Sequence, residues 1–214
     1  MRGFLQRIRN FEISARRRMG FDNHANVFEA IYRGNKWRMG SGPGSTVEDT
    51  APYREFLSGF LKAYRISSVL DLGCGDWQFS SLIDWSGLQY IGADVSETAL
   101  TSARPHSAPN ISFQVLNAIE DPLPSVDLLI AKDVLQHWSN ADILGFLPKL
   151  DKFRFALITN GFPSKKTRYI NKNIRPGKGR PVDLSSPPFN LSGTYVFEYS
   201  GFEPKRVFLW SRPE

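Results

Sequence analysis

The chain has 214 residues, 41% of them apolar and 22% charged, which suits a globular domain and argues against a chain disordered throughout. Cys74 is the only cysteine, so an intrachain disulfide and a cysteine zinc cluster are excluded. No apolar run approaches the ~20 residues that span a bilayer. Residues 1–20 also lack the apolar stretch of a signal peptide, so we expect a cytoplasmic protein.

The net charge of +6 is concentrated in two segments. Residues 1–20 carry six arginines against one acid, and residues 163–192 carry seven lysines and arginines against one acid. Concentrated positive charge favours anionic partners. Apolar residues at helical spacing over 4–19, with arginines between them, predict a basic amphipathic helix. This helix could pack on the protein body or make a weak contact with an anionic membrane surface.

Residues 34–159 predict a glycine-rich loop and a helix followed by an alternating α/β pattern. Residues 34–46 form a glycine-rich loop, and apolar residues from Tyr53 to Tyr64 predict a helix with one buried face. We expect strands at 67–72, 89–94, 111–116, 126–132 and 153–159, and helices at 80–85, 96–104 and 140–152. Ser96 is the expected N-cap of the second of these helices. The alternation predicts a parallel sheet with helices on both faces, which binds ligands beyond the carboxyl ends of its strands.

The alternation stops at residues 160–192, which are rich in Pro, Gly, Lys and Arg. A long irregular segment in a compact domain is usually functional or disordered. Two β-rich runs, 194–199 and 205–211, follow it and predict an antiparallel pair that closes the sheet.

The loop after the first expected strand reads VLDLGCGDWQFS from Val69 to Ser80. Gln78 stands where a dinucleotide-binding loop has its third glycine, and no Gly-Lys-Ser/Thr follows to make a P-loop. Asp76 would repel a pyrophosphate at the approach to the next helix. The loop is therefore suited to a ligand that carries positive charge.

The sequence DLGCG from Asp71 to Gly75 resembles the D-x-G-x-G signature of class I S-adenosylmethionine-dependent methyltransferases. Asp94, 23 residues beyond Asp71, matches the acid that this family places at the end of its second strand to hold both ribose hydroxyls. Trp77 replaces the usual third glycine. The resemblance implies a Rossmann-like fold with a mostly parallel seven-stranded sheet, an antiparallel last strand and helices on both faces.

The resemblance also implies which residues hold S-adenosylmethionine. The sulfonium and α-amino groups are cationic, and the amino acid end of the cofactor would lie against the acid-rich glycine loop. Asn117 and Ala118, in NAIEDPLP after the third strand, would lie at the edge of the adenine. The implied set is Asp71, Gly73, Gly75, Asp76, Trp77, Asp94, Asn117, Ala118 and Lys132.

Four motifs together resemble a small subgroup of these enzymes associated with surface-glycan assembly: IYRGNKWRMGSGPGST, LDLGCGDW, KDVLQHWS and NKNIRPGKGRPVDLSSPPFNL. The subgroup has Arg-Asp where this chain has Lys132 and Asp133, and Trp-Arg-Pro-Leu-Asn where it has GRPVD from Gly179 to Asp183. We expect one domain overall: a cap over 1–50, comprising the basic helix and the glycine-rich segment, and a methyltransferase domain over 51–214 with 160–192 as its acceptor-side loop.

The acceptor side offers two chemical interpretations. His137 lies four residues after Asp133, so a helical turn would place both on one face, with Asp133 orienting His137 as a general base. A surface histidine at a helix start is the competing interpretation. Alternatively, Asp133 and Asn160 follow strands four and five, where some sugar and catechol methyltransferases hold Mg²⁺, although two oxygen ligands are few.

The sequence SPPF resembles a motif of amino-methyltransferases, but it lies past the fifth strand. We interpret it as structural.

We predict O-methylation of a sugar or glycan hydroxyl, with no metal. By resemblance, Arg175, Arg180 and Asp183 would bind the acceptor, and the arginines would favour an anionic one. The alternatives are a nucleic-acid or protein N-methyltransferase and a non-catalytic, cofactor-binding partner protein. Nucleic acid is the less favoured partner, because no RNA-binding module accompanies the basic segments and aromatic residues are not interleaved with them. The oligomeric state does not follow from the sequence.

Overall fold

The computed structural model describes residues 24–163 and 169–213, and the basic helix predicted for residues 4–19 lies outside this range. Seven strands form one sheet in the order β3-β2-β1-β4-β5-β7-β6. β1 to β5 are parallel, and β7 is antiparallel to both of its neighbours, as predicted. The strands are β1 Ser68–Leu72, β2 Gln89–Asp94, β3 Ile111–Val115, β4 Val126–Lys132, β5 Phe153–Gly161, β6 Thr194–Ser200 and β7 Pro204–Ser211.

Four α-helices accompany the sheet in the described part of the chain: α2 His24–Arg33, α3 Ala51–Ala63, α4 Glu97–Ala103 and α5 Asn140–Phe146. The predicted N-cap of α4 is confirmed, because the Ser96 side chain accepts a hydrogen bond from Ala99 N at 3.2 Å. Short 3₁₀ turns occupy Pro43–Ser45, Ser80–Leu82, Arg104–His106, Leu135–His137 and Leu147–Lys152.

Two predicted helices are shorter in the structure. Residues 80–85 hold only a 3₁₀ turn, because Ser80 is fixed from both sides: its hydroxyl donates to Asp71 and its carbonyl accepts from Trp85 Nε1. The helix predicted for 140–152 ends at Phe146 and continues as a 3₁₀ turn. Pro148 lies at this change, and proline has no N–H for an α-helical hydrogen bond.

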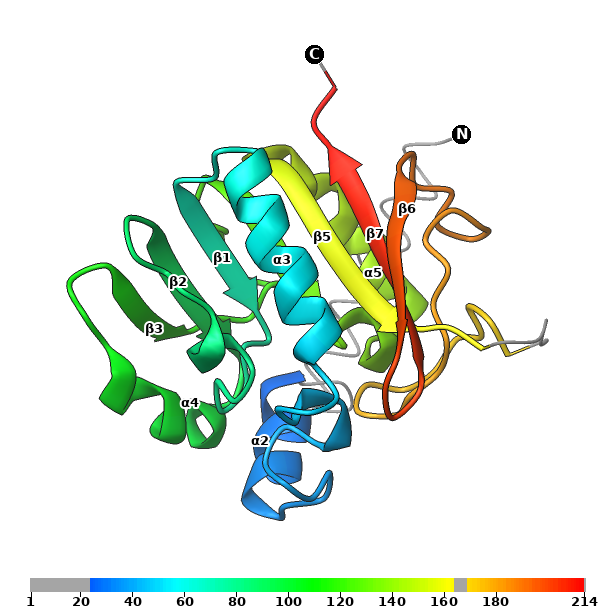
Figure 1. Ribbon diagram of the computed structural model, residues 1–214. Helices are drawn as coiled ribbons and strands as arrows, with labels where there is room; N and C mark the ends of the chain where they lie inside the picture. The colour runs from blue at the N-terminus through cyan, green and yellow to red at the C-terminus, as the bar shows by residue number, and fades with distance from the viewer. Residues whose placement is uncertain (1–23, 164–168, 214) are drawn as a thin grey trace.

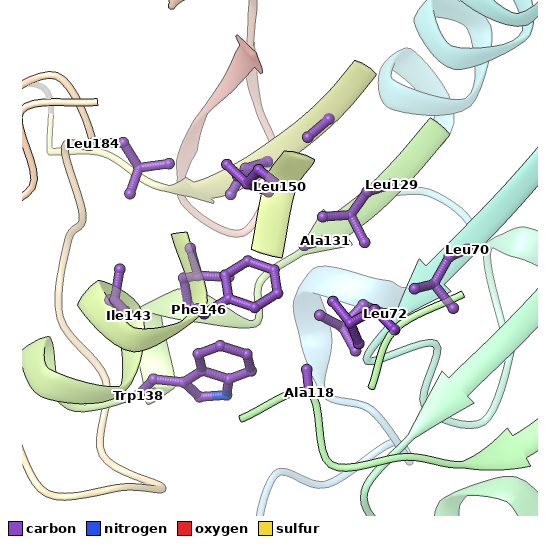
Figure 2. Close-up of a cluster of buried hydrophobic side chains, with 14 of the residues drawn as sticks. Leu70, Leu72, Ala118, Leu129, Ala131, Trp138, Ile143, Phe146, Leu150 and Leu184 are labelled. Atoms are coloured by element: carbon purple, nitrogen blue, oxygen red, sulfur yellow. The ribbon is translucent and has the colours of Figure 1, made fainter. Parts of the chain in front are cut away.

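The core lies on both faces of the sheet. α3 and α4 cover one face, where Tyr53 and Leu57 are fully buried. On the other face, Phe146 and Trp138 lie side by side against the strands (Figure 2), their ring centroids 5.3 Å apart. Val182, Leu184 and Phe189 of the irregular segment also pack there, with Leu184 only 1% exposed, so these residues of the predicted acceptor-side loop belong to the core.

The carboxyl ends of the parallel strands meet at one edge of the sheet, and α2 lies beneath that edge (Figure 1). α2 was not predicted from the sequence, although Phe28 and Ile31 occupy the positions expected of a buried helical face. In the ranges that the structure describes, no helix is long and apolar enough to cross a membrane.

Candidate active site

A cavity of about 440 Å³ opens at this edge of the sheet, within the range usual for ligand sites. α2 and the glycine-rich segment contribute to its wall through Tyr32, Trp37 and residues 41–45. Eight of the residues predicted from the sequence line it: Gly73, Asp94, Asn117, Ala118, Lys132, Asp133, His137 and Arg180.

Three polar contacts fix α2 and the glycine-rich segment to the sheet domain. Glu29 of α2 accepts hydrogen bonds from Ser96 and Thr98 at the start of α4, and these lower the pKa of Glu29 to about 2. The Ser41 hydroxyl donates to Asp76 at 2.6 Å. Lys132 Nζ donates to the carbonyl of Gly44 at 2.7 Å. These contacts hold α2 and the glycine-rich segment against the carboxyl ends of the parallel strands.

Asp94 ends β2 at the cavity and is 5% exposed. One carboxylate oxygen accepts from Gly75 N at 3.1 Å and the other from Ser96 N at 2.9 Å. Burial raises the pKa of Asp94 to about 6, against the lowering effect of these backbone donors. Asp94 is therefore ionised at pH 7, and each oxygen keeps acceptor capacity for a ligand hydroxyl.

The glycine loop depends on backbone conformations that side chains rarely adopt. Gly73 has φ +71°, and a Cβ there would lie 2.4 Å from Val134. Gly75 has φ +58°, and a Cβ there would lie 2.1 Å from the Ser41 hydroxyl. Gly73 lines the cavity, whereas Gly75 acts through its N–H to Asp94.

Three side chains of this loop do not reach the cavity wall. Asp71 is 1% exposed and accepts hydrogen bonds from Tyr90 at 2.6 Å and Ser80 at 2.7 Å, while burial raises its pKa. Trp77, at φ +63°, donates from Nε1 to Tyr90 at 2.9 Å and is buried. Asp76 holds Ser41. The structure thus gives these three residues roles in shaping the loop, where the sequence predicted cofactor contacts.

Asn117 and Ala118 lie after β3 on the cavity wall. The Asn117 side chain accepts from Ile119 N at 3.1 Å, and the backbone N–H of Asn117 donates to the Asp121 side chain at 2.8 Å. Ala118 is buried, and its carbonyl accepts from Lys149 at 2.7 Å. These hydrogen bonds hold the turn that would lie at the edge of the adenine.

Asp133 does not orient His137, and this prediction was wrong. Asp133 has φ +59°, so the chain between the two residues is not a regular helical turn. Its two carboxylate oxygens pair with Lys132 and Lys205, each at 2.6 Å. These two ammonium groups hold the pKa of Asp133 at about 2, in spite of its burial.

The same contacts argue against the magnesium interpretation. Both oxygens of Asp133 face lysine ammonium groups, and Asn160 Oδ1 accepts from Gln136 N at 3.1 Å. Among residues 24–163 and 169–213, no group of three or more His, Cys, Asp or Glu side chains is arranged to hold a metal ion.

His137 ends the 3₁₀ turn after β4 and faces the cavity, half-buried beside Trp37 at a centroid distance of 5.1 Å. Its Nδ1 lies 2.9 Å from the carbonyl of Lys178, which can only accept. Nδ1 therefore carries the proton, and Nε2 keeps its lone pair, with the Gln136 side-chain nitrogen 3.4 Å away. Burial lowers the pKa of His137 below its ordinary value of 6.5, so the ring is neutral at pH 7.

The three predicted acceptor-binding residues differ in position. Arg180 lines the cavity and is buried. Arg175 is exposed, away from the cavity wall. Asp183 accepts from Ser185, Ser186 and Tyr195 and joins the irregular segment to β6, so the structure gives it a local structural role.

The sequence did not identify several residues that line the cavity. Glu203 and Lys205 reach it from the β6–β7 hairpin, joined by an ion pair at 2.7 Å, and Phe202 beside them is 69% exposed. Nothing in the local sequence distinguishes these charges from solvated ones. Tyr32 and Trp37 lie in the motif IYRGNKWRMGSGPGST, so attention to its aromatic residues could have found them.

The residues present fit S-adenosylmethionine. Asp94 contacts only backbone donors in the described chain, so its remaining lone pairs are available to ribose hydroxyls. Gly73 brings backbone to the cavity beside Asp94, because its conformation and its close contact with Val134 leave no room for a side chain. The buried turn at Asn117 and Ala118 completes the same side of the cavity.

Comparison with known proteins agrees with this geometry. A family model described as a methyltransferase domain matches residues 69–153. No curated protein sequence matches the chain significantly.

Many solved structures share the fold, and three of them illustrate its range. The magnesium protoporphyrin IX methyltransferase of Synechocystis PCC 6803, solved with S-adenosylmethionine, is 15% identical with a TM-score of 0.62, covering 89% of this chain and 98% of that one. The N-terminal domain of EvdMO1, solved in the presence of S-adenosylhomocysteine and D-fucose, is 13% identical with a TM-score of 0.58, covering 75% and 82%. The methyltransferase domain of bacterial CtHen1 is 17% identical with a TM-score of 0.57, covering 74% and 96%.

These likenesses show the Rossmann-like fold of class I methyltransferases. The domain match extends over β1 to β4, the strands whose carboxyl ends carry Asp94 and the glycine loop. That match, on this fold, supports a methyltransferase activity that depends on S-adenosylmethionine.

Proposed function

We propose that the protein O-methylates a hydroxyl of an anionic sugar or glycan acceptor. The observation that carries the proposal is the state of His137 at the cavity: the ring is neutral, and the contact of Nδ1 with Lys178 leaves Nε2 as a proton acceptor. A hydroxyl needs such a base, because it is a poor nucleophile until its proton begins to leave. The sugar class is supported by the four motifs that resemble the glycan-assembly subgroup.

Charge at the cavity favours an anionic acceptor. Lys132 and Lys205 are balanced by Asp133 and Glu203, with which they form ion pairs. Arg180 is buried, and within the described ranges its guanidinium contacts carbonyl and amide oxygens but no carboxylate. A buried, uncompensated guanidinium attracts phosphate or carboxylate oxygens.

In the proposed reaction, Asp94 and Gly73 bind the cofactor and His137 acts as the base. S-adenosylmethionine supplies the electrophilic methyl group of its sulfonium when bound. Asp94 accepts hydrogen bonds from the ribose hydroxyls, and Gly73 keeps the loop close to the cofactor. His137 takes the acceptor proton at Nε2, where the acceptor hydroxyl replaces the 3.4 Å contact of the Gln136 amide, while Nδ1–H stays on the Lys178 carbonyl. The transfer requires the acceptor hydroxyl and the methyl group to be in line, and the cavity would hold both reactants.

Two other functions remain as competing hypotheses. A nucleic-acid or protein N-methyltransferase would use the basic segments 1–20 and 163–192 to bind its substrate. A non-catalytic partner protein would bind the cofactor and transfer nothing. The contact of residues 1–20 with an anionic membrane surface also stays a prediction.

The proposal is tested by methyl transfer from radiolabelled S-adenosylmethionine to a defined set of acceptors. The set contains glucose 1-phosphate, UDP-glucose, neutral methyl glucoside, a lysine-rich peptide and transfer RNA. We expect label on an anionic sugar, in an O-methyl ether identified by mass spectrometry, and little on methyl glucoside. Label on RNA or peptide nitrogen would instead establish the N-methyltransferase hypothesis.

A further inference from the structure

Segment 171–180 wraps around the turn that carries His137. The N–H of Gly177 donates to the His137 carbonyl at 3.0 Å, and the N–H of Arg180 donates to the Gln136 carbonyl at 3.3 Å. The carbonyl of Lys178 accepts from the His137 ring. Segment 171–180 thus holds both the backbone and the imidazole of this residue.

Arg180 fixes segment 171–180 in place. Its guanidinium donates to the carbonyl of Leu135 at 2.7 Å, to Asn140 Oδ1 at 2.9 Å and to the carbonyl of Lys172 at 3.2 Å. These three acceptors lie before His137, after it and on segment 171–180 itself. A single buried side chain therefore joins the His137 turn to the stretch of backbone that presents the Lys178 carbonyl.

Gln136 acts on the other ring nitrogen. The N–H of Gly161 donates to Gln136 Oε1 at 2.7 Å, and a backbone N–H can only donate, so this contact assigns the oxygen of the amide. The amide nitrogen then faces His137 Nε2 at 3.4 Å. An NH₂ group donates, so it favours an unprotonated Nε2, the same tautomer that the Lys178 carbonyl favours at Nδ1.

We propose that Gln136 and Arg180 are positioning residues that together set the tautomer of His137. Gln136 presents a donor to Nε2, and Arg180 holds the Lys178 carbonyl against Nδ1–H. The two act in place of the carboxylate that often orients a catalytic histidine, since Asp133 is engaged by two lysines. The catalytic consequence rests on the proposed function, whereas the tautomer itself is a property of the free protein.

The test is long-range ¹H–¹⁵N NMR of the histidine side chains, recorded against pH in the full-length protein without acceptor. The chain has three histidines, and the His137 signals are assigned by their loss in His137→Gln. In the native protein we expect the Nδ1-protonated tautomer. Gln136→Glu is nearly isosteric and places a carboxylate beside Nε2, so it should keep the ring charged to a pH higher by about one unit or more.

Arg180→Ala frees the Lys178 carbonyl and should give a mixture of the two tautomers. Lys172→Ala is the matched control, because it removes one positive charge from segment 171–180 and keeps the carbonyl that Arg180 contacts. We expect it to leave the His137 signals unchanged. If Arg180→Ala does not fold, Asn140→Ala, which removes one acceptor of the guanidinium, replaces it with the same expectation.

An Nε2-protonated ring in the native protein would overturn the proposal. Signals of His137 that do not change in Gln136→Glu and Arg180→Ala would overturn it equally. Neither result depends on turnover, so the tautomer can be as proposed even if the acceptor assays show that His137 is not the base.

Discussion

At the scale of single residues, two carboxylates near the cavity show how surroundings decide function. Asp94 is held by backbone N–H groups, and burial raises its pKa to about 6. Asp133 is held by two lysines, which lower its pKa to about 2. The first keeps acceptor capacity for a ligand, whereas the second uses both oxygens in ion pairs that join β4 to β7.

Asp94→Ala should weaken binding of S-adenosylhomocysteine by about 100-fold or more, because a hydrogen bond to a charged acceptor contributes about 1.5–3 kcal/mol and this carboxylate would accept two. In the native protein the affinity should also fall as the pH drops through about 6, where the carboxyl takes up a proton and loses acceptor capacity. Calorimetry at pH 5 and pH 7.5 measures both effects.

The matched control is Asp84→Ala, which removes an exposed carboxylate outside the cavity and should leave the affinity unchanged at either pH. Equal affinity of the native protein and Asp94→Ala would show that Asp94 does not bind the ribose hydroxyls.

At the scale of elements, the spacing of apolar residues predicted a helix where local sequence determines the structure, and failed where distant contacts determine it. The spacing of six apolar residues from Tyr53 to Tyr64 predicted α3. Four of them, Tyr53, Leu57, Phe60 and Leu61, are buried as expected, whereas Phe56 is half-buried and Tyr64 is exposed. The helix predicted at 80–85 failed because Ser80 is held by contacts to β1 and to Trp85 that no periodicity reveals. Propensity favoured a helix there, and tertiary hydrogen bonds decided otherwise.

Leu57→Ala should lower the free energy of unfolding by about 2–5 kcal/mol, because Leu57 is fully buried between α3 and the sheet and its loss leaves a cavity. Leu82→Ala removes a leucine that is 52% exposed and should change the value by about 0.5 kcal/mol or less. Urea denaturation of both variants checks the prediction, and equal effects would contradict the described packing of α3.

At the scale of the whole molecule, the sequence predicted the mostly parallel sheet, its antiparallel last strand and the edge that binds the cofactor. It predicted Gly73 and Asp94 because family motifs place them after defined strands. It missed Lys205 as the partner of Asp133, since the two lie 72 residues apart and ion pairs leave no trace in local sequence. The division into a cap over 1–50 and a methyltransferase domain over 51–214 stays a prediction.

The central claim is that neutral His137 takes the acceptor proton, and the dependence of kcat on pH tests it most directly. The measurement compares the native enzyme with His137→Ala on the sugar found in the acceptor assay. The native kcat should fall as the pH drops, with a midpoint below 6.5, because burial lowers the pKa of His137 and protonation removes the base. His137→Ala should lose about 10²- to 10⁴-fold in kcat and lack this fall, while S-adenosylhomocysteine binds it normally. A variant with near-native kcat and the same pH profile would contradict the account.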